Sequence, residues 1–473
     1  MTNAPTHAAS AEVTAIDSHA RGPLLLLLGS GLVWLVISGI LALITSIQLH
    51  SPAYFADCSW LTYGRASALR ETAFIYGWSA NAGLGIALWI LGRLSGSPLR
   101  GLNWTVVGTL FWNLGISLGL VGIATGDMTS FSLLQLPGYV QPLLAFAFAT
   151  ISISGVLAWS GRRTDGAYAS QWYAVAALFI FPWLLVAGQA VLLWIPVRGA
   201  LQAVAAGWYA QGVWSLWLAP LALAGAYYVT PKITGRALAA YESAPLGFWT
   251  LIVVGSWTGG RHLIGGPVPV WLSTVAVVAY GLLLFHYLVV AINLRAAFSA
   301  SSLSASFLRW GVFSYVLVGI LEFLCTFRGI SVVAQFTLID LAIEQLGLYG
   351  GVTMLLFASL YYMVPFLVGR DWAVPALATG HRILVTVGVV ALVGALAYAG
   401  WEQSSDLSSP SVAFGGILAH IRPSLLAIAA AQLLLLIANL LLLVNFATTV
   451  FASYCSACGA DLGQPSKMEA HAS

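Results

Sequence analysis

The stretch Trp249-Thr-Leu-Ile-Val-Val-Gly-Ser-Trp-Thr-Gly-Gly-Arg261-His262-Leu-Ile-Gly-Gly266 decides how the chain is interpreted. It is an apolar run that ends in a neighbouring arginine and histidine set among glycines. Gly259, Gly260, Gly265 and Gly266 allow another backbone, or a flat ligand, to come close. An ionisable pair at membrane depth is costly and therefore marks a functional site by default. The alternative is an interfacial pair whose polar ends reach the lipid headgroups, and composition alone favours that alternative.

The composition is that of a polytopic membrane protein. Of the 473 residues, 60% are hydrophobic and only 7% are charged, whereas soluble globular proteins carry about 25% charged residues. The net charge of +3 is small and no basic stripe occurs, so no nucleic-acid partner is expected. The first apolar run is too long for a cleavable signal and lacks the usual small-residue cleavage site.

Hydropathy predicts an all-α integral membrane protein that forms a twelve-helix bundle. The expected spans are 23–48, 71–95, 102–125, 139–160, 171–196, 203–229, 246–264, 268–294, 309–332, 339–368, 381–401 and 423–452. Because the connections are short, one membrane domain over 23–452 is expected. A flexible cytoplasmic N-terminus over 1–22 and a cytoplasmic tail over 453–473 would flank it.

The lysines and arginines predict the orientation of the bundle. Of the 18 in the chain, twelve fall on the side of both termini and six on the other side. Cytoplasmic loops carry the excess of positive charge, so both termini are expected in the cytoplasm. Arg70, Arg261 and Arg328, three of the six, are expected to be half-buried, which makes the loop bias stronger.

Three motifs elsewhere in the chain accompany the opening stretch. Trp60-Leu-Thr-Tyr-Gly-Arg65 precedes the second expected helix. Tyr227-Tyr-Val-Thr-Pro-Lys-Ile-Thr-Gly-Arg236 ends the sixth, and Tyr361-Tyr-Met-Val-Pro-Phe-Leu-Val-Gly-Arg370 ends the tenth. In order and spacing, these motifs resemble the catalytic subunit of cbb-type heme–copper oxidases, subunit I. The resemblance covers roughly residues 25–400.

That resemblance implies a bundle of twelve helices in the bacterial inner membrane, with the lipid bilayer around it. It also implies heme b and copper as cofactors, and other membrane subunits or cytochrome c-type subunits as partners. The family's heme-ligand positions fall here on Arg70, Ile343 and Gln345, and its copper-ligand positions on Gln211, Arg261 and His262.

Most of these six positions have lost their histidine. Arginine keeps its proton and has no lone pair to offer, and isoleucine has no donor atom. An amide is a poor ligand for copper. Only His262 remains, so this chain is expected to bind neither heme nor copper.

Charged residues close to the lost ligands suggest what replaces the metals. Glu322, Arg328 and Glu344 are candidate buried charges, since unpaired charges in lipid would be expensive. We expect Arg261 to point into the bundle and to pair first with Glu344 and second with Glu322. In the alternative, Arg70, Glu71 and Asp340 lie at helix ends in water.

Two interpretations remain open for each of three further features: Tyr241, His286 and the cysteine pair near the C-terminus. Tyr241 stands at the place of the family's redox-active tyrosine, but without its histidine partner an aromatic residue of the interface belt is favoured. His286 matches no ligand position and is expected to be a polar contact or an interfacial residue. Cys455-Ser-Ala-Cys458 looks like half of a zinc ribbon, which needs two more ligands, and a free reduced pair is favoured.

Three functions remain open at this point. The first is a cofactor-depleted scaffold or accessory subunit of a respiratory or electron-transfer complex. The second is a working terminal oxidase or nitric oxide reductase, against which the lost ligands argue. The third is an ion or small-molecule transporter that uses the vacated cavity, and only the polar residues at membrane depth speak for it.

Overall fold

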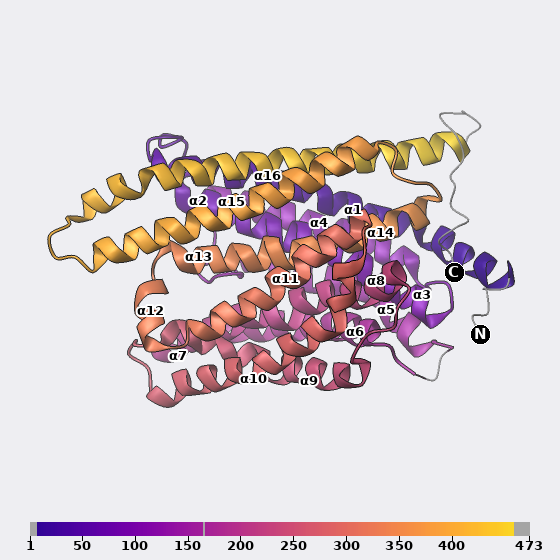
Figure 1. The fold of residues 1–473 in the computed structure, drawn as a ribbon, viewed down its shortest axis with the longest axis horizontal. Helices are drawn as coiled ribbons and strands as arrows, with labels where there is room; N and C mark the ends of the chain where they lie inside the picture. Colours follow the sequence, from indigo (N-terminus) through magenta and orange to yellow (C-terminus); the bar gives the residue numbers. More distant parts are fainter. Residues whose placement is uncertain (1–6, 164–165, 458–473) are drawn as a thin grey trace.

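The computed structural model describes residues 7–163 and 166–457, and every regular element in these ranges is helical. The first half holds α1 (His7–His50), α2 (Tyr63–Thr72), α3 (Ala80–Ser95), α4 (Leu102–Thr125), α5 (Gln141–Ser160), α6 (Ala169–Gln189), α7 (Ala200–Gly212) and α8 (Ala219–Thr234). The second half holds α9 (Ala244–Val254), α10 (Val270–Leu294), α11 (Leu303–Leu324), α12 (Arg328–Ala334), α13 (Leu338–Gln345), α14 (Met354–Val368), α15 (Pro375–Leu407) and α16 (Phe414–Ala457) (Figure 1).

Shorter helical segments join or extend these helices. Four are π-helical: η2 (Ala73–Ser79), η3 (Ala190–Trp194), η4 (Val213–Leu218) and η8 (Leu346–Thr353). Four have 3-10 geometry: η1 (Ser59–Leu61), η5 (Tyr241–Ser243), η6 (Gly255–Leu263) and η7 (Arg295–Ser299). Consecutive segments such as α2, η2 and α3 therefore form one continuous helix that changes locally from α-helical to π-helical hydrogen bonding.

Eleven segments within the described ranges are long and apolar enough to cross a membrane. The remaining expected span is α9 followed directly by η6, with 11 and 9 residues. The all-helical membrane bundle is thus confirmed, with twelve helical segments only when this broken one is included. The spans are helical because lipid offers no hydrogen-bond partner to an exposed backbone.

Two expected boundaries are wrong. The ninth span, expected at 309–332, ends at Leu324, and α12 is a separate short helix. Residues 7–22, expected to be flexible, are the first turns of α1. Asp17 explains this order, because its carboxylate lies 2.5 Å from Nη2 of Arg93 and accepts a hydrogen bond from the Trp89 indole at 2.9 Å.

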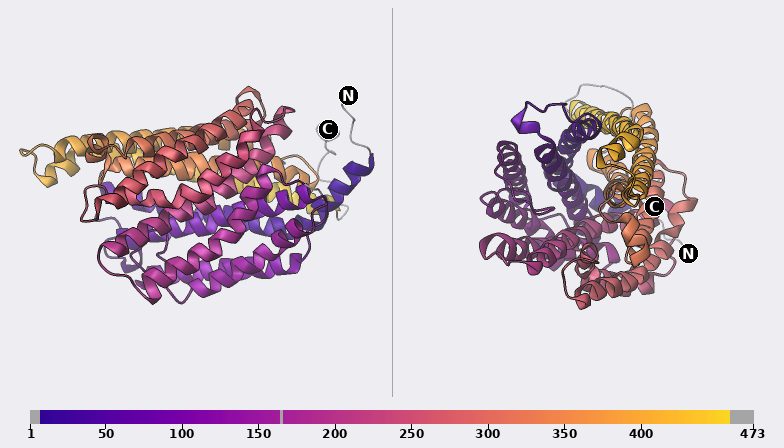
Figure 2. Two further views of the ribbon diagram at one scale, coloured as in Figure 1. Left: turned by 90° about the horizontal axis from the view of Figure 1, so that it is seen from below. Right: turned by 90° about the vertical axis from the view of Figure 1, so that its left-hand side faces the viewer.

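The helices run side by side along the long axis and form one bundle, which Figure 2 shows from below and from one end. The start of α1 and the end of α16 lie at the same end of it (Figure 1), and the Arg21 guanidinium donates a hydrogen bond to the Ser453 hydroxyl there. An even number of crossings requires this arrangement. Which side of the membrane holds this end stays a prediction.

The segment η6 is held against α7 by two glycines. A Cβ atom on Gly259 would lie 2.2 Å from the carbonyl oxygen of Gly207, too close for any side chain. The two backbones therefore touch, as the glycines of the opening stretch led us to expect. This contact fixes where the residues after Gly259 leave the helix.

Large aromatic side chains fill the interior of the bundle. Trp78, Trp112 and Trp217 are fully or almost fully buried, and the rings of Phe181 and Trp217 stack with centroids 3.6 Å apart. Trp78 and Trp217 follow Arg70 and Gln211 by about two helical turns on the same spans, and α4 and α6 place Trp112 and Phe181 beside them. These aromatic side chains make a dense apolar layer between the two polar residues and the end of the bundle that holds the termini.

Candidate functional site

A cavity of about 370 Å³ lies inside the bundle, near the end where α7 and α13 begin. Four of the six predicted ligand positions line it, namely Gln211, Arg261, His262 and Ile343. They come from α7, η6 and α13, which are far apart in the sequence. The fold therefore brings together four of the ligand positions that the resemblance implied.

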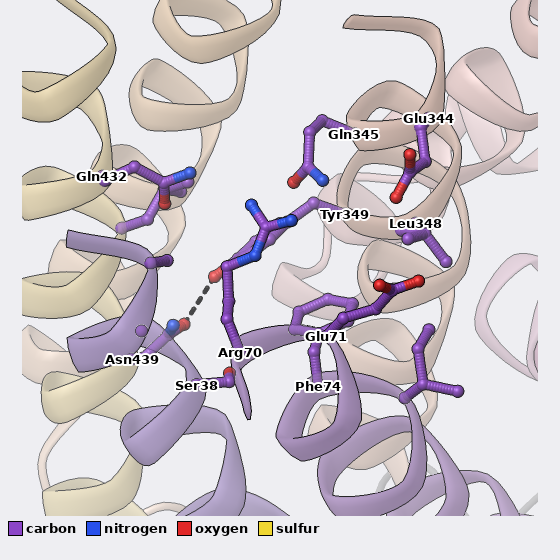
Figure 3. Close-up of a pocket in the computed structure, with 14 residues that line it drawn as sticks. Ser38, Arg70, Glu71, Phe74, Glu344, Gln345, Leu348, Tyr349, Gln432 and Asn439 are labelled. Atoms are coloured by element: carbon purple, nitrogen blue, oxygen red, sulfur yellow. Dashed lines mark hydrogen bonds between the residues drawn. The ribbon is translucent and has the colours of Figure 1, made fainter. Parts of the chain in front are cut away.

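The other two positions, Arg70 and Gln345, face one another across two smaller cavities of about 40 and 240 Å³. Figure 3 shows the Arg70 side chain extending from α2 toward the amide of Gln345. Glu71 and Glu344 line both of these cavities and also the larger one. All six predicted ligand positions thus line three neighbouring cavities that share Glu71 and Glu344.

Arg261 is the best-buried charge that lines these cavities, since only 2% of its side chain is exposed. Its Nε atom lies 2.6 Å from a Glu322 carboxylate oxygen, and its Nη2 atom lies 3.3 Å from Asp340 Oδ1. The Tyr280 hydroxyl donates a second bond to Glu322 at 3.2 Å. The predicted inward direction of Arg261 is confirmed, and interfacial snorkelling is wrong for this residue.

The predicted first partner of Arg261 is wrong, because Glu344 forms no ion pair with it in the part of the chain that the structure describes. The predicted second partner, Glu322, is confirmed as the nearer carboxylate, and Asp340, one helical turn before Glu344 on α13, is the other. The cause is the winding of η6. The seven residues from Gly255 to Arg261 rise about 2.0 Å each in a 3-10 helix instead of 1.5 Å, which moves Arg261 by about 3.5 Å, roughly two-thirds of an α-helical turn.

The winding of the helices changes beside the predicted positions on three spans. The π-helical segments begin at residue 73 after Arg70, at residue 213 after Gln211, and at residue 346 after Gln345. Such segments are rare and occur often at functional sites. No propensity signal in the sequence marks them, so sequence reasoning missed them.

His262 and Glu344 are both exposed, and their surfaces face the cavity. The Nε2 atom of His262 lies 3.5 Å from Arg261 Nη2, so the imidazole sits beside a guanidinium. Arg328, predicted to be half-buried, is exposed at the start of α12, and this prediction is wrong. The helix that would have buried it ends four residues earlier.

Tyr241 lies away from the cavity. It precedes α9, while Arg261 is near the end of η6, so about 35 Å of helix separates them. Its hydroxyl accepts a hydrogen bond from the Ala169 backbone N–H at 3.0 Å, and its ring stacks on Tyr168. The place of a redox-active tyrosine is therefore wrong for Tyr241, which has a structural role.

The remaining candidates have simple roles. His286 is fully buried and forms hydrogen-bond contacts with the Gly247 carbonyl at 2.8 Å and the Tyr315 hydroxyl at 3.0 Å, so it is a polar contact and not an interfacial residue. Cys455 lies in the last turn of α16, and Cys458 lies outside the described residues. Within those residues, no group of three or more His, Cys, Asp or Glu could hold a metal ion.

Residues 23–414 match the protein family described as cytochrome c and quinol oxidase polypeptide I. The chain belongs to this family. The resemblance inferred from the sequence is thereby confirmed at the level of subunit I of the heme–copper oxidases.

Relatives of this oxidase-family chain share about a fifth to a quarter of its residues. It is 23% identical to the cbb3-type cytochrome c oxidase subunit CcoN1 of Stutzerimonas stutzeri, over 77% of this chain and 80% of that protein. It is 22% identical to the bacteroid cytochrome c oxidase subunit 1 homolog of Bradyrhizobium diazoefficiens, over 93% of this chain and 84% of that one.

A solved structure supports the same fold. The chain superimposes on one chain of a heme-copper terminal oxidase dimer determined by cryo-EM with a TM-score of 0.70, at 12% identity, covering 98% of this chain and 86% of that chain. At this identity the likeness shows the fold alone.

The side chains at the six positions do not fit the family's cofactors. Arg70 and Ile343 have no lone pair for iron, and the amides of Gln211 and Gln345 are weak donors. The two cavities that Arg70 and Gln345 line have volumes of about 40 and 240 Å³, below the roughly 300–1,000 Å³ of typical ligand and cofactor sites. The rings of Phe74 and Tyr349, 5.8 Å apart, help to close the smaller cavity.

Proposed function

We propose that this chain is a scaffold or accessory subunit of a respiratory or electron-transfer complex that has kept the oxidase fold without heme or copper of its own. One observation carries the proposal. The six former ligand positions line three neighbouring cavities, and His262 alone among them offers an imidazole. A single imidazole does not supply the ligand set that either cofactor needs.

The ion pairs around Arg261 support the same proposal. In this family, metal and heme carry the positive charge at the centre of the bundle. Here the guanidinium of Arg261 lies within ion-pair distance of the carboxylates of both Glu322 and Asp340. The centre is therefore stabilised by protein charges, and helix packing is kept without a cofactor.

The two alternatives receive less support. A working terminal oxidase or nitric oxide reductase would need heme ligands that Arg70 and Ile343 cannot replace. A transporter would need a path through the whole bundle, whereas the buried aromatic layer around Trp112 and Trp217 lies between the cavity and the other end. The cavity is thus a pocket reached from one side.

The expected setting follows from the family and from the charge distribution. The bilayer that surrounds this multi-span protein would be the bacterial inner membrane, with both termini in the cytoplasm. The partners would be cytochrome c-type subunits or other membrane subunits, which would supply the redox chemistry that this chain lacks.

Heme and copper analysis of the purified full chain tests the proposal. We expect no Soret band and far less than one copper per chain, with the same result for His262→Ala as a control. One heme per chain, removed by a substitution at one of the six positions, would refute the absence of a cofactor. The scaffold role is tested separately by affinity purification from native membranes. There, heme-containing subunits should accompany the chain, and a chain that purifies alone would contradict this role.

A further inference from the structure

The cavities around Arg70 contain polar side chains that no protein group satisfies. Arg70, Glu344, Gln345 and Gln432 all line these cavities. Within the described residues, none of the four side chains makes a hydrogen bond or an ion pair. Glu71 differs, because it accepts hydrogen bonds from Gln135 and Ser132.

Gln432 is the most informative of these residues. Only 8% of it is exposed, and α16 carries it into the bundle interior. Figure 3 shows its amide on one side of Arg70, with the amide of Gln345 on another. A buried amide without a partner is unfavourable in a membrane protein, so this one calls for a ligand or for water.

The charges are arranged in two groups. In Figure 3 the guanidinium of Arg70 lies near the two amides, while the carboxylates of Glu71 and Glu344 point toward each other on the other side of the pocket. Arg70 forms no ion pair with either glutamate, although the three side chains line the same space. Each group therefore keeps its charge available to a bound molecule.

We propose that this pocket binds a small zwitterion of the free amino acid class. A guanidinium with two flanking amides is suited to a carboxylate, which accepts paired N–H donors. The two glutamates are suited to an ammonium group, which has only donors. One molecule that carries both groups would satisfy the two sides at once, and of the two cavities that Arg70 lines, the one of about 240 Å³ gives it room.

The charge balance predicts which amino acids bind best. One arginine and two glutamates give the pocket a net charge of −1 when all three are ionised. A neutral zwitterion such as glycine leaves that charge unbalanced. Lysine carries a second ammonium group and neutralises it, so we expect lysine to bind more tightly than glycine.

The ligand would enter from the end of the bundle opposite the termini. The larger cavity reaches Leu49 near the end of α1 and Tyr63 at the start of α2. In the other direction, Trp78 and the aromatic side chains around it close the interior. The pocket would therefore sense an amino acid on one side of the membrane, and not carry it across.

Calorimetry and thermal unfolding of the full chain in lipid nanodiscs test this inference, which rests on the proposed absence of heme. The probes are L-lysine, glycine, acetate and methylammonium at equal ionic strength. We expect lysine to bind most tightly and glycine more weakly. Acetate and methylammonium, which carry one charged group each, should bind at least about tenfold more weakly than lysine.

Arg70→Gln and Glu344→Gln should each weaken lysine binding by at least about tenfold, and Gln432→Leu is the milder third variant if the first two fail to fold. Asp406→Asn, near the end of α15, changes a carboxylate that pairs with His420 and lines neither cavity, so this variant should bind as the unaltered chain does. A folded, heme-free chain that binds none of the four probes would overturn this inference and leave the proposed function intact. Acetate binding as tightly as lysine would have the same two consequences. Heme in the same preparation would refute the proposed function instead.

Discussion

Replacement of Arg261 by methionine would test the charge arrangement at the centre of the bundle most directly. The substitution keeps most of the volume of the side chain but removes the only cation within ion-pair distance of Glu322 and Asp340 among the described residues. Two carboxylates would then remain without a counter-charge. Breaking a buried ion pair by removing one partner costs about 3–5 kcal/mol.

The structure favours the lower end of that range. The side chains of Glu322 and Asp340 are 18% and 23% exposed to the cavity, so water screens part of the repulsion. With an unfolding entropy of about 2.1 cal/mol/K per residue, the 473 residues give about 1 kcal/mol/K. A loss of about 3 kcal/mol then lowers the melting temperature by about 3 °C.

Thermal unfolding in detergent, followed by intrinsic tryptophan fluorescence, measures this change. The double variant Arg261→Met with Glu322→Gln should be milder than Arg261→Met alone, because it removes one of the stranded charges. Arg328→Met is the matched control, since this arginine is exposed and should change stability by less than about 0.5 kcal/mol. If Arg261→Met melts at the same temperature as the unaltered chain, the ion pairs do not stabilise the centre and the argument fails.

Three further predictions concern packing, the N-terminal helix and orientation. Gly259→Ala should prevent η6 from touching α7 and sharply reduce the yield of folded protein, measured as the monodisperse peak in size-exclusion chromatography. Gly329→Ala, with open space around it, should leave that yield unchanged. Asp17→Asn should lower the melting temperature by about 3 °C, because it leaves Arg93 without its carboxylate, and the added Arg93→Gln change should restore part of the loss. A membrane-impermeant maleimide should label Cys58 in intact spheroplasts but not the Cys58→Ser chain, and labelling only after lysis would reverse the orientation.

Hydropathy was sufficient to predict most of the spans because an apolar segment of this length is stable in lipid only as a helix. An apolar segment of about 20 residues must satisfy its own backbone and therefore forms a helix. The boundaries failed where polar contacts extend a helix beyond the apolar run. Asp17 shows this, because its ion pair with Arg93 lies inside a stretch whose composition looks like a flexible tail.

The partner of Arg261 could not be predicted for a different reason. Asp340 and Glu344 are four residues apart and share a helix face, so the sequence offers both equally. The choice depends on whether the segment before Arg261 rises as an α-helix or as a 3-10 helix. Backbone packing of Gly259 against Gly207 accompanies the 3-10 form, and this contact between distant segments is invisible in a single sequence.

The charged side chains at the two former cofactor positions differ in whether they form ion pairs. At the copper position, the guanidinium of Arg261 pairs directly with two carboxylates, so its charge is engaged within the protein. At the heme position, Arg70 and Glu344 face the same cavity without pairing. A membrane protein keeps such unpaired charges only where something else balances them. Stability should therefore respond to Arg261 with or without solutes, whereas the effect of Arg70→Gln should grow when lysine is present. Equal effects of Arg70→Gln with and without lysine would mean that both positions serve structure alone.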